Sequence, residues 1–94
     1  MIAGWRERID DLDRMILGLC SRRAELACRI AREKEARNLD LLSPDREADI
    51  LSALRAANPG PLEPDGVERI FRRIIDECRE LARLAPAGGR VPWL

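Results

Sequence analysis

Apolar side chains recur at helical spacing along the first third of the chain. From Ala3 to Arg37 the positions on one face lie three or four residues apart, which is the pattern of one long α-helix. The positions on this face are Trp5, Ile9, Leu12, Ile16, Leu19, Arg23, Leu26 and Ile30. Arg23 is the one charge among them. A charge is costly to bury unpaired, so Arg23 needs an acidic neighbour or an anionic ligand.

Two shorter helices follow. Ser43 and Pro44 are typical of an N-cap and a first helical residue, and they predict a second helix that runs to about Ala57. Pro64 opens a third helix, which ends near Leu84. The inward face of the second helix is Glu47, Ile50, Leu51 and Leu54. The inward face of the third is Val67, Ile70, Phe71, Ile74, Cys78, Leu81 and Ala82, with Ile75 on its flank.

The composition agrees with an all-α protein. Only three aromatic residues occur, and β-branched residues form no alternating runs. The expected organisation is a single helical domain over residues 1–85 and a C-terminal tail over residues 86–94, whose Trp93 and Leu94 have no assigned role. Seventeen basic residues balance seventeen acidic ones. This balance argues against nucleic acid as a partner.

The cysteines do not indicate a metal site. Cys20, Cys28 and Cys78 form no CxxC motif, and the sequence has no histidine. We expect free thiols, with Cys20 and Cys28 serving as packing or surface residues. No secretory signal and no membrane-spanning run is recognisable, so a cytoplasmic protein without membrane contact is expected.

The length of the first helix implies a partner. At about 1.5 Å per residue it is about 50 Å long, too long to be covered by its own chain. Lys34 lies eleven residues after Arg23, on nearly the same face, whereas Arg6 lies seventeen residues before Arg23 and about 25 Å away. Pairing two copies antiparallel about Gly18 would bring Arg6 of one copy opposite Ile30 of the other. The cations would then line one shared site.

The expected site suits a small dianion. Arg23, Lys34 and Arg6 of a second copy would meet Arg46 and Glu47 from the start of the second helix. Guanidinium groups bind carboxylates through paired hydrogen bonds, lysine supplies a point charge, and a glutamate accepts from a hydroxyl or ammonium group. Histidine and tyrosine are absent from the sequence. These residues favour a reaction that needs positioning and charge stabilisation, such as a unimolecular rearrangement.

Three segments resemble one known family. They are WRERIDDLDRMILGLCSRRAELACRIAREK, SPDREADIL and VERIFRRIIDECREL, within Trp5 to Leu84. Together they resemble the all-α class of chorismate mutases, whose relatives include 4-amino-4-deoxychorismate mutases and isochorismate pyruvate lyases. The resemblance implies an intertwined helical homodimer that converts chorismate to prephenate by a Claisen rearrangement without a cofactor.

The resemblance also implies roles for individual residues. Arg6 would reach the substrate carboxylates from the other subunit, and Arg23 from the same subunit. Lys34 would bridge a carboxylate and the ether oxygen, while Arg46 and Glu47 would lie beside the C4 hydroxyl, with Glu47 the direct acceptor. Ser43, Cys78, Ala82, Ile30 and Ile75 complete the set of expected substrate contacts.

Three of these positions depart from the family pattern. Ser43 stands where Asp is common, and Cys78 replaces a usual Ser. Ala82 stands where Gln or Glu usually donates to the ether oxygen. Three explanations follow: a slow chorismate mutase, a site completed by an activating partner enzyme, or a different substrate. The different substrate would be an amino-substituted chorismate whose ammonium faces Glu47, or isochorismate.

Each charge also has a plain structural alternative. Arg23 could lie at the edge of the apolar face with its guanidinium in solvent. Lys34 could stabilise the end of its helix, and Glu47 could stabilise the start of the next helix. A helical dimer without catalytic activity is therefore the alternative to an enzyme. The remaining charges of the third helix are expected on solvated faces: Arg72, Arg73, Glu77 and Arg79.

Overall fold

The computed structural model describes residues 1–84 and contains three helices in that part of the chain. They are α1 (Ile2–Ala36), α2 (Pro44–Ala57) and α3 (Pro64–Leu84). The all-α prediction is confirmed, and the helix boundaries differ from the predicted ones by no more than one residue. The predicted tail, with Trp93 and Leu94, lies outside the described residues. None of the three helices is long and apolar enough to cross a membrane.

The ends of α1 and α2 are set by local backbone chemistry. After α1, Asn38 adopts a left-handed conformation with φ 56°, which asparagine tolerates better than most residues. The Leu39 N–H then donates to the Lys34 carbonyl at 2.7 Å, closing the last turn. Ser43 occupies the N-cap position of α2 as predicted, but its side chain makes no capping hydrogen bond. Only its carbonyl takes part, accepting from the Glu47 N–H at 3.0 Å.

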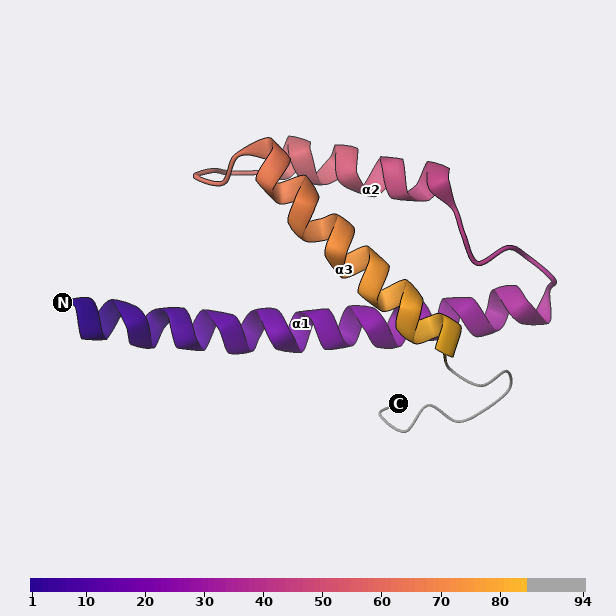
Figure 1. The fold of residues 1–94 in the computed structure, drawn as a ribbon, viewed down its shortest axis with the longest axis horizontal. Coiled ribbons are helices and arrows are strands. Elements are labelled where there is room, and N and C mark those ends of the chain that lie inside the picture. Colours follow the sequence, from indigo (N-terminus) through magenta and orange to yellow (C-terminus); the bar gives the residue numbers. More distant parts are fainter. Residues whose placement is uncertain (85–94) are drawn as a thin grey trace.

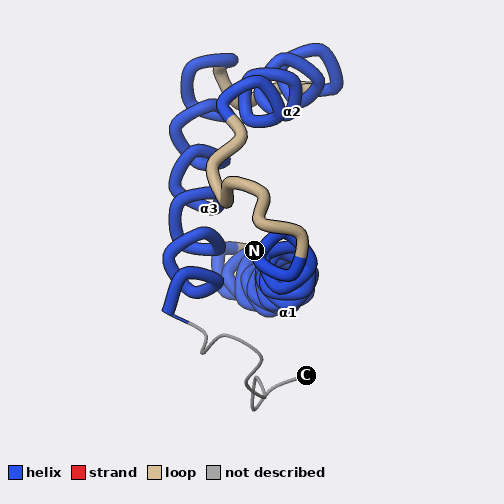
Figure 2. Tube along the Cα trace, turned by 90° about the vertical axis from the view of Figure 1, so that its right-hand side faces the viewer, coloured by secondary structure: helices blue, strands red, loops and turns tan. Residues whose placement is uncertain are grey.

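The arrangement places α3 between the other two helices. Within the described residues α3 contacts both α1 and α2, whereas α1 and α2 do not contact each other. Figure 1 shows α3 running obliquely from α2 to α1, and Figure 2 shows the space that this leaves between α1 and α2. Ion pairs from Arg55 to Asp65 at 2.8 Å and to Glu68 at 3.2 Å join the end of α2 to the start of α3.

The buried core is small and centred on α3. Its members are Cys28, Leu51, Val67, Ile75, Cys78 and Ala82. Ile75, expected on the flank, is buried, whereas Ile70, expected inward, is 47% exposed. The reason is that α3 packs against two helices at once, so its buried face is turned toward both.

Burial raises the pKa of the Cys28 thiol, Arg32 opposes this rise and Cys78 adds to it. Cys28 therefore packs as a neutral thiol.

The described chain is a slab with an uncovered apolar face. It measures 53 × 30 × 15 Å, with a radius of gyration of 16.0 Å, compared with about 12 Å for a compact domain of this length. A thickness of 15 Å is little more than one helix. The apolar residues of the predicted α1 face are more than half exposed: Trp5, Ile9, Leu12, Ile16, Leu19, Leu26 and Ile30. An exposed apolar face of this size is typical of an interaction surface.

Candidate active site

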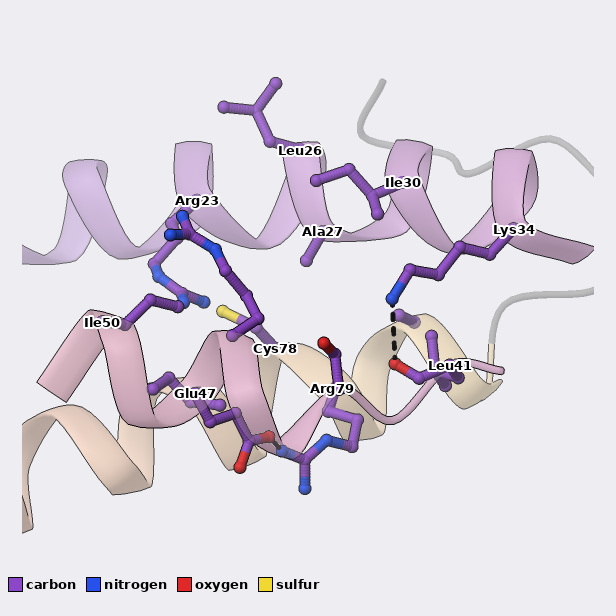
Figure 3. Close-up of a pocket in the computed structure, with 14 residues that line it drawn as sticks. Arg23, Leu26, Ala27, Ile30, Lys34, Leu41, Glu47, Ile50, Cys78 and Arg79 are labelled. Carbon is purple, nitrogen blue, oxygen red and sulfur yellow. Dashed lines mark hydrogen bonds and ion pairs between the residues drawn. The ribbon is translucent and has the colours of Figure 1, made fainter. Parts of the chain in front are cut away.

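A cavity of about 330 Å³ lies in the space between α1 and α2. Figure 3 shows side chains from α1 above the cavity and from α2 below it, with α3 behind. From α1 and the loop after it the lining residues are Arg23, Leu26, Ala27, Ile30, Lys34, Leu41 and Ser43. From α2 and α3 they are Arg46, Glu47, Ile50, Ile75, Cys78, Arg79 and Ala82. The cavity therefore gathers nine of the ten predicted site residues, and the remaining one is Arg6.

Two cations reach the cavity from α1. Arg23 and Lys34 both line it, because a separation of eleven residues returns to nearly the same face of a helix. The Lys34 ammonium donates a long hydrogen bond of 3.4 Å to the Leu41 carbonyl, across the turn that links α1 to α2. This contact orients Lys34 along the cavity (Figure 3) and leaves its other two N–H donors for a ligand.

The first turn of α2 forms one wall. Ser43, Arg46 and Glu47 line the cavity from there. A helix N-terminus carries partial positive charge and unpaired N–H groups, both of which attract anions. Arg46 is largely exposed at the rim, and Glu47 is half-buried.

The wall formed by α3 is mainly apolar. Cys78 and Ala82 are buried, and Ala82 packs against Cys28 of α1 in a small cluster that Ala31 and Leu81 extend. The position that the family pattern assigns to a hydrogen-bond donor thus presents a methyl group to the cavity. Cys78 adds a thiol, which is a weak donor.

Arg79 lines the cavity, contrary to the prediction from the sequence. It was expected on a solvated face, but its guanidinium forms an ion pair with Glu47 across the gap between α3 and α2. A sequence signal exists, because Arg79 lies four residues after Ile75 and three before Ala82, both of which are buried. Ile75 was assigned to the flank, and this assignment concealed the signal.

The charges around the cavity are strongly unequal. Four lining residues are cationic, namely Arg23, Lys34, Arg46 and Arg79, while Glu47 is the one acid among the described lining residues. The surface between them is apolar, with Ile30, Ile50 and Ile75 among its members. A cavity of this composition suits a small molecule that has an apolar body and carboxylate groups at its edge. Within residues 1–84, no cluster of potential metal ligands is found.

Arg6 does not reach this cavity. It lies on the exposed N-terminal part of α1 and is not among the lining residues. Seventeen residues of helix separate it from Arg23, which corresponds to about 25 Å. Any role for Arg6 at a cavity therefore requires the cavity of another copy.

A family model described as chorismate mutase type II matches residues 5–83. The chain belongs to this family. A bifunctional chorismate mutase/prephenate dehydratase from Stutzerimonas stutzeri is 38% identical over 94 residues, covering 88% of this chain and 26% of that protein. A protein of the same description from Pseudomonas aeruginosa has the same identity and coverage. A chorismate mutase structure (form II) from Thermus thermophilus matches with a TM-score of 0.86 and 31% identity, covering 88% of this chain and 94% of that one.

The two kinds of chorismate mutase relative differ in length. The chain spans about a quarter of the bifunctional proteins but nearly the whole of the Thermus chain. The chorismate mutase fold therefore accounts for essentially all of the described residues.

Proposed function

We propose that this protein is a chorismate mutase, which converts chorismate to prephenate without a cofactor. The observation that carries the proposal is the cavity itself, where Arg23 and Lys34 face the start of α2 across an apolar surface. Chorismate has two carboxylates on a small carbon skeleton, which fits that distribution of charge. Family membership over residues 5–83 supports the same activity.

The reaction needs only what the cavity offers. In the rearrangement, the carbon–oxygen bond of the enolpyruvyl ether breaks while a carbon–carbon bond forms, and no proton is transferred. Negative charge grows on the ether oxygen as the bond breaks. Arg23 would hold a carboxylate, and Lys34 would donate to the ether oxygen. The electrostatic field of these two cations is then in place before the negative charge develops on that oxygen.

The active species is proposed to be a homodimer with shared sites. Two features support a second copy as the missing layer: the uncovered apolar face of α1 and the 15 Å thickness of the slab. In an antiparallel pair centred near Gly18, Arg6 of one copy would lie opposite Ile30 of the other, between Arg23 and Lys34. This position would complete the ring of cations around the substrate. Three free cysteines fit a reducing compartment, and we infer the cytoplasm.

The test uses purified protein and chorismate, with the loss of chorismate followed by its ultraviolet absorbance and prephenate identified chromatographically. We expect prephenate to form several orders of magnitude faster than without protein. An Arg23→Ala preparation, purified identically, is the control for contaminating enzyme from the host. Prephenate formation at the uncatalysed rate would refute the proposed function.

A further inference from the structure

The ion pair between Arg79 and Glu47 is a feature that the proposed mechanism does not use. The two side chains come from different helices, and both line the cavity. They are 28% and 29% exposed, so solvent screens the pair less than it does the surface pairs of α3. Figure 3 shows Glu47 and Arg79 pointing toward each other below the cavity, opposite the side from which Lys34 enters.

The ion pair between Arg79 and Glu47 determines the net charge that a ligand meets on this side of the cavity. Glu47 is the one acid among the described lining residues, and its charge is compensated by Arg79, which also contacts Asp76 at 3.5 Å. A ligand ammonium placed here would find a neutralised carboxylate and an adjacent guanidinium. Like charges brought together in a binding site weaken binding. A hydroxyl has no such conflict, because it is uncharged and can donate a hydrogen bond to a glutamate oxygen.

We propose that Arg79 determines substrate specificity. By holding Glu47 in an ion pair, it makes the cavity select a dianion with a neutral hydroxyl over the corresponding dianion with an ammonium group. The inference rests on the proposed function and narrows its substrate class. Arg79 acts through Glu47 and is therefore a positioning residue.

The experiment compares two substrates and several proteins. The values of kcat/KM for chorismate and for 4-amino-4-deoxychorismate are measured for the wild type, Arg79→Leu, Arg79→Gln and Arg79→Lys. Arg72→Leu is the matched control, since Arg72 lies on the same helix, pairs with Glu68 at 3.5 Å and does not line the cavity. Circular dichroism establishes that each variant is helical.

The expected result is a change in the ratio of the two kcat/KM values. The wild type should prefer chorismate by at least about tenfold, which corresponds to about 1.4 kcal/mol. Arg79→Leu and Arg79→Gln should each move the ratio about tenfold or more toward the amino substrate, because Glu47 is then free to receive an ammonium group. Arg79→Lys and Arg72→Leu should keep the wild-type ratio. A role for Arg79 in stability alone would lower both values together and leave the ratio unchanged.

Several outcomes would overturn the inference. A wild-type preference for the amino substrate would overturn it. This comparison needs no variant, so it remains valid even if a variant fails to fold. Turnover of chorismate with the same ratio in the wild type, Arg79→Leu and Arg79→Gln refutes the specificity role and leaves the proposed function intact. Turnover of neither substrate by the wild type refutes the proposed function and this inference with it.

Discussion

Replacing Lys34 with methionine is expected to lower kcat for chorismate by about 10²- to 10³-fold. Removing one preorganised donor to a developing oxyanion has an effect of this size. Methionine keeps most of the apolar stem and removes the charge. Lys34 also lies in the last turn of α1, where a cation contributes about 0.3–1 kcal/mol to helix stability. This contribution is too small to explain the expected loss of rate through unfolding.

The measurements are kcat and KM, from rates over a range of chorismate concentrations, together with the melting temperature. Arg37→Met is the matched control, because Arg37 follows α1 directly, pairs with Glu33 on the exposed surface and does not line the cavity. It should retain wild-type kcat. If Lys34→Met retains more than about a tenth of kcat, the ammonium makes no direct contact with the reacting oxygen.

Introducing glutamine at Ala82 is expected to raise kcat, by about tenfold to a hundredfold. Ala82 lines the cavity on the α3 side and supplies no hydrogen bond there. A glutamine amide would donate to the ether oxygen from the side opposite Lys34, and one donor of this kind contributes about 10²- to 10³-fold. We expect less than the full effect, because a larger side chain beside Cys28 causes overpacking that costs about 1–3 kcal/mol of stability.

Ala82→Met separates the two contributions. Methionine has nearly the length and volume of glutamine but no N–H, so it should reproduce the loss of stability without the gain in kcat. Equal kcat for Ala82→Gln, Ala82→Met and the wild type would mean that the substrate's ether oxygen is not directed toward α3. That result would contradict a position of the ether oxygen between Lys34 and Ala82.

Helical periodicity and capping residues were enough to predict the helices. Proline at the first turn of α2 and α3, and the break after Arg37, place each boundary within one residue. The same spacing brought Arg23 and Lys34 to one face of α1, because two residues on one rigid helix have a relative position that sequence alone defines.

The packing of the helices against one another was harder to predict from the sequence. Arg79 was missed and Ile70 and Ile75 were exchanged, because periodicity defines a face only to within about one residue's rotation. Which part of that face is buried depends on where a neighbouring helix crosses, and here α2 passes beside Arg79. For Ser43 the sequence predicted the N-cap position correctly but not the hydrogen bonding, since the Ser43 hydroxyl makes no capping hydrogen bond.

Each active site is proposed to take Arg23 from one chain and Arg6 from another. Arg6→Ala and Arg23→Ala should each be nearly inactive, and mixing them should restore activity if the chains assort into pairs. A mixed pair contains one site with both arginines intact, so an equimolar mixture, unfolded together and refolded, should recover about one quarter of wild-type activity. Sedimentation should give twice the chain mass of 10.7 kDa for each preparation.

The control co-refolds Arg6→Ala with the double variant Arg6→Ala/Arg23→Ala. No pair in this mixture contains an intact Arg6, so its activity should not exceed that of Arg6→Ala alone. Recovery of about a quarter of wild-type activity in the first mixture, and none in the control, is the predicted result. Activity of the first mixture no greater than the average of its two components would contradict a site shared between chains.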